Sequence, residues 1–275
     1  MSDFAYDPVT AIDESAAVGD TAMVFAEIRR TMGIPLVTSI WRGLAGMDDS
    51  LRPAWDAAKP IYESDEPERA LARSIAATNL PSPEPLAPTA LTCIGMTEGD
   101  VGAARAVIAA YNRSNGLNLM ALATLIAPTA TGSGAVPAAA SRASPARWPP
   151  LRPLLPREAI AADTWDIIRR VNAFGAAGLD AGIATLWRHL AHWSGLLALI
   201  HCAFAPLQSR GLIDEATARL VALSDMEAAQ MAHLCPTLPR LSPKVLAAIT
   251  GYVSRPTQVA RMVVIGHALA AWLAP

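Results

Sequence analysis

The sequence predicts an all-α protein, and three observations support this. A stretch with Trp-Arg near its start occurs twice, at 40–58 and 186–204, and its apolar residues recur at alternating steps of four and three. That spacing gives a helix one apolar face. Apolar residues make up 52% of the 275 residues and charged residues only 17%, which suits a sizeable core. Because no stretch alternates strictly as a β-strand does, we expect helices throughout.

The repeated stretches also indicate that one helical unit occurs twice in the sequence. The matched blocks, with offsets of 140 to 146, are 28–30 with 168–170, 41–42 with 187–188, 44–45 with 190–191, and 108–111 with 249–252. Blocks that keep their order at a nearly constant offset are typical of a duplicated unit. We predict two related helical repeats, packed as a pseudo-twofold dimer within one chain. The first repeat is 1–128, a linker is 129–156, and the second repeat is 157–275.

The first repeat begins with a predicted helix over 20–31, which Gly33 and Pro35 end. The first Trp-Arg helix follows, with a length of about five turns. Thr38 and Ser39 precede it and are candidate N-caps. A further helix is expected over 66–79, and the prolines of 80–88 end it.

The last helices of the first repeat are predicted from their end signals. Thr97 with Asp100 resembles a capping box, so a helix should open there and run through Tyr111. We predict that it stops at Ser-Asn-Gly, 114–116, because Asn and Gly accept the left-handed conformation that ends helices. A second helix then covers 117–127.

The linker is rich in Ala, Pro, Ser and Gly, so its early part should be flexible and its proline-rich later part extended. In the second repeat we predict helices over 160–173 and 213–233, with the second Trp-Arg helix between them. Helical sequence over 243–273 is broken at Arg-Pro-Thr, 255–257. This break falls where the first repeat has 114–116, so both repeats are expected to interrupt the same helix.

Composition limits the partners and the compartment. The 22 basic and 24 acidic residues nearly balance, so we expect no nucleic acid as partner. The acidic N-terminus is unlike a secretory signal, and the longest apolar runs are too short to cross a membrane. Three cysteines without CxxC spacing indicate neither disulfides nor a zinc site. We expect a cytoplasmic protein, and its low charge and many alanines make a homodimer plausible.

Conventional catalytic motifs are missing from the sequence. It has no P-loop, GxGxxG, GxSxG or HExxH, so we expect no cofactor. His189 and His192 could touch one ion, but no carboxylate or cysteine lies at matching spacing nearby. We therefore expect no metal, and interpret these histidines as solvated or capping.

Two groups of polar residues could serve a ligand. Arg42 and Arg188 are equivalent by the repeat, and could meet to bind a carboxylate as a bidentate fork or instead pair with acids on neighbouring helices. Asn112, Asn115 and Asn118 lie in an otherwise apolar stretch. Their amides could hold a water or orient a carboxylate; alternatively, Asn115 only caps the helix and the other two face solvent.

The arrangement resembles the non-stereospecific (group I) 2-haloacid dehalogenases, a family of cofactor-independent helical proteins made of two related repeats. The resemblance covers most of the chain, in the order IRRTMGIPLV, AAYNRSN, LRPLLP and LAHW, which begin at 28, 109, 151 and 190. In that family an aspartate of the second repeat activates a water that displaces halide directly from carbon 2 of the acid. An asparagine of the first repeat helps to hold that water.

The resemblance implies a site between the repeats. The family's asparagine carries over onto Asn115, with Asn112 also matching, whereas the position of the aspartate is occupied by Leu186. The nearest carboxylate is Asp180, which we take as a reserve base. The remaining substrate-binding residues that we expect are Thr38, Ser39, Arg42, Thr185, Leu186 and Arg188.

Three hypotheses follow. The first is a diverged hydrolase of small 2-substituted, for example 2-halo, carboxylic acids that is weak or inactive without the matched aspartate, since a general base contributes about 10²- to 10⁴-fold in rate. The second is a non-catalytic protein that binds a small apolar carboxylic acid. The third is a purely structural helical dimer.

Overall fold

The computed structural model describes residues 11–47, 49–87, 89–127, 147–179, 182–235 and 241–274, and every regular element in these ranges is a helix. The predicted all-α class is therefore confirmed. The expected flexible start of the linker lies outside the described residues, and so does Asp180. The α-helices are α1 Gly19–Met32, α2 Ser39–Ala45, α3 Leu51–Glu63, α4 Glu66–Ala77, α5 Ala90–Cys93, α6 Glu98–Ile126, α7 Ala162–Asn172, α8 Thr185–His189, α9 Ser194–Ser209, α10 Leu212–Gln230, α11 Pro243–Ser254 and α12 Val259–Trp272. Four short 3₁₀ turns are η1 Glu14–Ala16, η2 Arg157–Ala159, η3 Leu190–His192 and η4 Ala232–Leu234.

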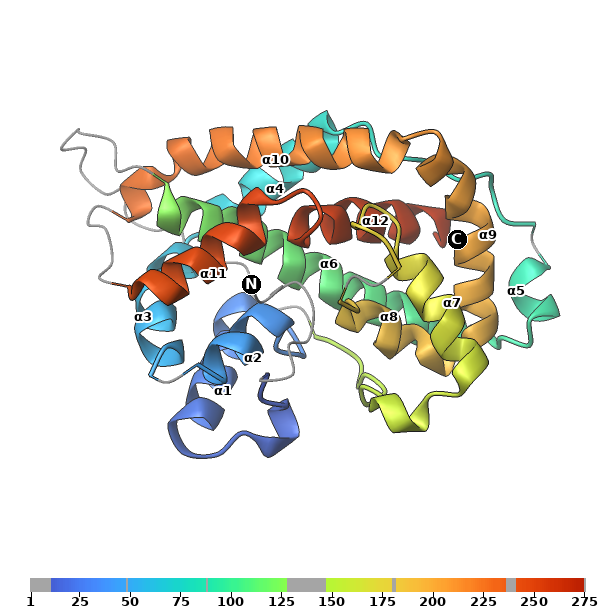
Figure 1. Ribbon diagram of the computed structural model, residues 1–275, viewed down its shortest axis with the longest axis horizontal. Coiled ribbons are helices and arrows are strands. Elements are labelled where there is room, and N and C mark those ends of the chain that lie inside the picture. Colours follow the sequence, from blue (N-terminus) through green and yellow to red (C-terminus); the bar gives the residue numbers. More distant parts are fainter. Residues whose placement is uncertain are drawn as a thin grey trace.

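Helix α6 runs through the middle of the molecule (Figure 1). Helices α1 to α3 lie at one end of it, α7 to α9 lie at the other, and α10 crosses the top. Its first turn is closed by the capping box between Thr97 and Asp100, as predicted. Because both ends of the molecule are built against this helix, its length sets the length of the fold.

The predicted end of a helix at 114–116 is wrong, because α6 continues without interruption to Ile126. Gly116 is buried against α4, where a Cβ would lie only 2.3 Å from Cδ2 of Leu71. The glycine therefore allows two helices to approach closely, and it does so with ordinary helical geometry. In the second half the expected break is real, since α11 ends at Ser254 and α12 begins at Val259.

The two Trp-Arg stretches are also shorter helices than predicted. The first divides into α2 and α3, and between them Asp49 has a φ of 46°. The second divides into α8, the 3₁₀ turn η3 and α9. The spacing of the apolar residues in each stretch continues unchanged across the turn, and these residues, here named the apolar seam, remain buried on both sides of it, as Leu44, Leu51, Leu190 and Leu197 show. The seam therefore could not reveal where the chain changes direction.

The core consists of two apolar clusters, and α6 contributes to both. Its part from Leu117 to Leu125 packs with α1 to α4, α10 and α11, whereas its part from Ala104 to Tyr111 packs with α7 to α9. Helix α12 is divided in a similar way, with Val263 in the first cluster and Leu269 in the second. Both clusters thus take side chains from both halves of the chain, and the two halves meet along α6 and α12.

In the described part of the chain, no single helix is both long and apolar enough to cross a membrane. Helices α9 and α10 satisfy the length and composition criteria only as a pair, with a bend of 77° between them.

Candidate functional site

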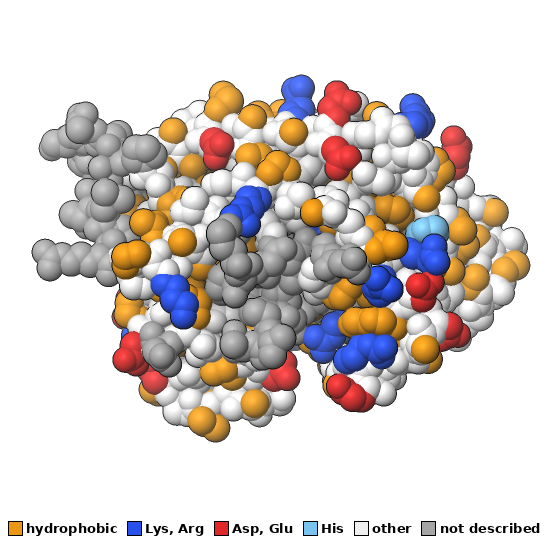
Figure 2. Space-filling model, in the orientation of Figure 1, with side chains coloured by type: hydrophobic (Ala, Val, Ile, Leu, Met, Phe, Trp, Pro, Cys, Tyr) orange, Lys and Arg blue, Asp and Glu red, His pale blue; other side chains and the backbone are white. Residues whose placement is uncertain are grey.

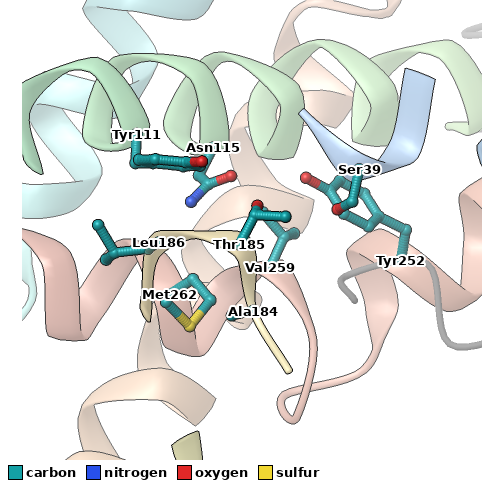
Figure 3. Close-up of a pocket in the computed structure, with 9 residues that line it drawn as sticks. All are labelled: Ser39, Tyr111, Asn115, Ala184, Thr185, Leu186, Tyr252, Val259 and Met262. Carbon is teal, nitrogen blue, oxygen red and sulfur yellow. The ribbon is translucent and has the colours of Figure 1, made fainter. Parts of the chain in front are cut away.

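A small space lined by buried residues, here named the inner hollow, lies where the two halves meet beside α6 (Figure 3). Its volume for water-sized molecules is about 10 Å³, close to what a single water needs. The nine residues that line it are Ser39, Tyr111, Asn115, Ala184, Thr185, Leu186, Tyr252, Val259 and Met262.

The two sides of the inner hollow come from different elements. Tyr111 and Asn115 are one turn apart on α6, so they project from the same face. They point towards the segment 184–186 at the start of α8, while Ser39 and Tyr252 close another side (Figure 3). The break before α12 brings Val259 to the wall. Helix starts therefore supply much of the lining.

Two pairs of these residues are related by the sequence repeat. The offset of 146 relates Ser39 to Thr185, and the offset of 141 relates Tyr111 to Tyr252. Hydroxyl groups that the predicted repeat would make equivalent thus face one space. Four of the predicted site residues line this space, namely Ser39, Asn115, Thr185 and Leu186.

Thr38 and Asn118 lie directly behind the inner hollow and hold its wall. The Nδ2 of Asn118 donates to the hydroxyl of Thr38 at 2.8 Å. Its Oδ1 accepts from Nε1 of Trp41 at 3.1 Å and from the hydroxyl of Tyr62 at 2.8 Å. Thr38 precedes α2 but does not cap it with its side chain, because its hydroxyl is engaged with this network.

Asn118 also reaches the second half of the chain. Burial raises the pKa of Tyr252, and a hydrogen bond with Asn118 partly offsets this rise. The Tyr252 phenol is therefore protonated at any physiological pH. The sequence analysis named Asn118 with Asn112 and Asn115, at steps of three along the chain, but the family resemblance carried only the other two over to the site. The alternative that Asn112 and Asn118 face solvent is wrong, because both are buried.

Asn112 lies on α6 away from the inner hollow. Its Nδ2 donates to the carbonyl oxygen of Gly266 in α12 at 2.9 Å. A Cβ on Gly266 would lie 2.0 Å from Oδ1 of Asn112, so the glycine makes room for the amide. The Oδ1 atom is buried without a hydrogen-bond partner among the described residues. Asn112 therefore joins α6 to α12.

The two equivalent arginines line a second space, here named the outer cavity, with a volume of about 480 Å³. It is bounded by segments 13–15, 35–37 and 151–156, together with Arg42, Tyr111, Arg188 and His189. Figure 2 shows the molecule notched at its lower edge, with basic side chains gathered to the right of the notch. Arg42 and Arg188, which were predicted either to meet around a carboxylate or to pair with acids on neighbouring helices, both line this cavity and not the inner hollow.

Each of these arginines has partners in the protein. The NH2 group of Arg42 pairs with Asp13 at 3.0 Å, and its Nε donates to the carbonyl oxygen of Ile12 at 3.2 Å. Arg188 donates from Nε and NH2 to the carbonyl oxygen of Leu155. These bonds fix the guanidinium groups on the wall of the outer cavity, where an anion could add to them.

Tyr111 belongs to both spaces, since it lines the inner hollow and the outer cavity. Its hydroxyl lies 3.4 Å from Nδ1 of His189, and the two rings meet edge to face. Nε2 of His189 is hydrogen-bonded to the carbonyl oxygen of Arg152. His189 is buried, so the interpretation of this histidine as solvated is wrong. Tyr111 was missed as a site residue because a tyrosine in an apolar seam has the appearance of core.

The charge state of His189 follows from its burial. Burial lowers the pKa of His189 below its ordinary value of 6.5, the hydrogen bond with Arg152 opposes this, and the charge of His192 lowers it further. The ring is therefore neutral at pH 7.

The base expected for a hydrolase is not among the described residues of the inner hollow. Leu186 occupies the wall where the family's aspartate was expected, and the nine lining residues include no carboxylate. In the described ranges, no cluster of three His, Cys, Asp or Glu could hold a metal ion. The arrangement can thus hold one water between an amide and hydroxyl groups.

Searches against models of protein families and against curated proteins give no match. Solved structures do match, over 96% of this chain. A D-2-haloacid dehalogenase in complex with L-LA has a TM-score of 0.66 at 15% identity, with 94% of that chain covered. A mutant of D-2-haloacid dehalogenase with D-2-CPA has a TM-score of 0.63 at 15% identity, with 93% covered, and a further mutant has 0.65 at 16%, also with 93% covered. The chain therefore has a haloacid dehalogenase-like fold.

Proposed function

We propose that this protein is a diverged hydrolase, related to the group I 2-haloacid dehalogenases, that lacks their aspartate at the matched position. It acts on small 2-substituted carboxylic acids, such as 2-haloacids, by direct attack of water on carbon 2. The observation that carries the proposal is the inner hollow, where Asn115 faces Thr185 across a space for one water. An amide offers both donor and acceptor, so it can orient a water without consuming it.

The roles of the other residues follow from their positions. Arg42 and Arg188 attract the carboxylate of the acid into the outer cavity. Ser39 and Thr185 offer hydroxyl donors to the acid in the inner hollow, and Leu186 and Met262 form the apolar wall for its side chain. The inner hollow is too small for the acid, so a side chain must move on binding. Met262 is suited to this because methionine is unbranched and adaptable. Asp180 remains the expected carboxylate base.

The first experiment measures halide release from D- and L-2-chloropropionate and from their bromo analogues by the full-length chain. We expect slow release that Asn115→Ala reduces by about 10- to 100-fold, since a misplaced nucleophile of this kind costs about two orders of magnitude. The matched control is Asn79→Ala, because Asn79 is exposed. Wild type without measurable release, or equal release by Asn115→Ala and Asn79→Ala, contradicts the proposal.

A second candidate is a non-catalytic protein that binds a small apolar carboxylic acid. The absence of a carboxylate among the nine lining residues favours it. Binding to the native state raises the melting temperature, so lactate and 2-chloropropionate should each shift it in this case. A shift in melting temperature without halide release identifies the binder, and neither effect indicates a purely structural protein.

A further inference from the structure

Tyr111 separates the two spaces of the site, and this position has a chemical consequence. Its phenol faces Asn115 and Thr185 on one side, and Nδ1 of His189 lies 3.4 Å from its oxygen on the other. His189 itself lines the outer cavity. A hydroxyl that lines a water-sized space and also contacts a histidine on a larger cavity can pass a proton between them.

The protonation of His189 can be assigned from its partners. A carbonyl oxygen only accepts hydrogen bonds, so the contact with Arg152 requires a proton on Nε2. In the neutral ring Nδ1 then carries a lone pair, and the hydroxyl of Tyr111 is its donor. Each hydrogen bond in the series therefore has one direction, from Tyr111 to His189 and from His189 to Arg152.

We propose that Tyr111 and His189 form a proton relay that accepts the proton of the attacking water, in place of the carboxylate that Leu186 replaces. The inference rests on the proposed hydrolysis. It assigns the base to described residues of this chain, whereas Asp180 was the expectation from sequence alone.

With this relay, the bonds formed and broken in the hydrolysis balance. The water oxygen forms a bond to carbon 2 of the haloacid, and the carbon–halogen bond breaks with its electron pair leaving on the halide. The water proton moves to the oxygen of Tyr111 while the phenol proton moves to Nδ1 of His189. His189, now a cation, releases that proton to water in the outer cavity. The products are the 2-hydroxy acid, halide and a proton.

Several charged groups surround His189 and set its titration. His192 lies one turn away, and its charge lowers the pKa of His189. Around the outer cavity the ionisable neighbours are Asp13, Glu14, Arg42, Tyr111, Arg152 and Arg188. Since burial and His192 both keep the ring neutral at pH 7, the relay is able to accept a proton there.

The test compares kcat for halide release between Tyr111→Phe, His189→Gln and two matched controls. The relay predicts that each of the first two loses about 100-fold or more, as expected for removal of a general base. His192→Gln removes a histidine whose Nε2 contacts the neighbouring carbonyl of Pro153. Tyr62→Phe removes a buried phenol oxygen that is bonded to Asn118 outside the inner hollow. At a pH above the rise in the profile, His192→Gln should retain kcat within about threefold, and Tyr62→Phe measures the loss caused by removing a buried phenol oxygen outside the relay.

The pH profile distinguishes a base from a structural contact. Activity should rise with pH through the pKa of His189, which lies below 6.5, and stay level above it. His192→Gln removes a charge that lowers this pKa, so the rise should move to higher pH.

Nitrogen NMR of His189 provides a readout that does not require turnover. The relay predicts a neutral ring with the proton on Nε2, and a Nδ1 resonance that changes in Tyr111→Phe. A proton on Nδ1, or a Nδ1 resonance indifferent to Tyr111→Phe, overturns the relay. Wild type without halide release overturns the hydrolase and, with it, the catalytic role of the relay; a responsive Nδ1 resonance then shows only that Tyr111 and His189 are hydrogen-bonded.

The kinetic outcomes also separate the two proposals. If wild type is active and Tyr111→Phe matches Tyr62→Phe, the relay is wrong and the hydrolase stands. The same follows if Asp180→Asn abolishes release while Tyr111→Phe retains it. Loss in Tyr111→Phe and His189→Gln, with Asp180→Asn retaining the rate, supports the relay.

Discussion

The predicted repeat matches helix α6 with the pair α11–α12, yet α6 is continuous and the pair is broken. Position 115 in α6 corresponds to Pro256 at the offset of 141, and α11 ends just before it. A proline lacks the N–H that a helix interior needs and clashes with the preceding turn. Asn115 and Gly116 permit a helix end without requiring one, and close packing against Leu71 keeps α6 straight through them. The break between α11 and α12 also brings Val259 to the inner hollow.

The same comparison extends to the polar groups behind the inner hollow. Trp41 donates from Nε1 to Asn118, whereas Nε1 of the equivalent Trp187 is buried without a partner among the described residues. The offset of 141 relates Asn118 to Val259, which has no acceptor to offer. One half is thus held by a buried polar network and the other by apolar packing.

A reversed difference occurs two residues further along each helix. Met120 in α6 is apolar, and the corresponding Arg261 in α12 is fully buried. Its guanidinium donates to the carbonyl oxygens of Thr257, Asn172 and Phe174, each within 3.0 Å. Arg261 therefore ties the start of α12 to the end of α7, a role that α6 does not need because it has no break to secure.

The largest expected loss of stability comes from removing the hydrogen bonds of Arg261. Arg261→Met places in α12 the residue that α6 has, but it leaves buried carbonyl oxygens without donors, and we expect a loss of about 3 kcal/mol or more in the free energy of unfolding. Denaturant unfolding measures it. Met120→Leu is the control and should cost about 1 kcal/mol. If Arg261→Met and Met120→Leu unfold at the same denaturant concentration, the hydrogen bonds of Arg261 contribute no more to stability than the packing of Met120.

Replacing the polar network of the first half should have the next largest effect. Asn118→Leu removes the buried oxygen that accepts from Trp41 and Tyr62, and we expect a loss of about 2 to 3 kcal/mol in the free energy of unfolding. The matching change in the other half, Val259→Leu, only alters volume and should cost about 1 kcal/mol. Thermal unfolding of the pair is the measurement, and a larger loss for Val259→Leu would contradict the comparison.

Two glycines of the second half sharpen the contrast between close and open packing. In Gly266→Ala the new methyl group meets Oδ1 of Asn112, so the bond between α6 and α12 must shift, and we expect a loss of about 1 to 2 kcal/mol. In Gly251→Ala the nearest atom is 3.9 Å away. That variant should gain about 0.5 kcal/mol from helix propensity. Chemical denaturation decides, and the comparison fails if both changes have the same sign.

The smallest difference concerns the two tryptophans. Trp41→Phe and Trp187→Phe remove similar volume from fully buried positions, but only the first removes a hydrogen bond. We expect Trp41→Phe to be the more destabilising by about 1 kcal/mol. Paired denaturant curves would resolve a difference of this size, and an equal loss would mean that the bond to Asn118 contributes little.

Much of the fold could be predicted because its signals are local. The helices over 20–31, 66–79 and 160–173 and the cap at Thr97 follow from apolar spacing and capping residues, and the structure has them within a few positions. The turn after α2 could not be seen, since the apolar seam stays in phase across it. The continuity of α6 depends on a distant partner, Leu71, that spacing along the chain does not reveal.

The candidate site was predictable only in part. Ser39, Asn115, Thr185 and Leu186 were expected near a common site and line the inner hollow. Tyr111 and Tyr252 were missed because their rings also serve the core, and only the hydroxyl positions distinguish them from ordinary core residues. The pairing of Tyr111 with His189 joins positions 78 apart in sequence, and no periodicity records such a contact.

The division of α6 between the two apolar clusters has a consequence for how the molecule comes apart. Since this helix gives its beginning to one cluster and its end to the other, melting either cluster removes the support of the other. Denaturation should therefore proceed as a single cooperative event. A polypeptide carrying only the first half would expose the apolar side chains of α6 that pack against the second half. It would need to associate with a second copy to bury them.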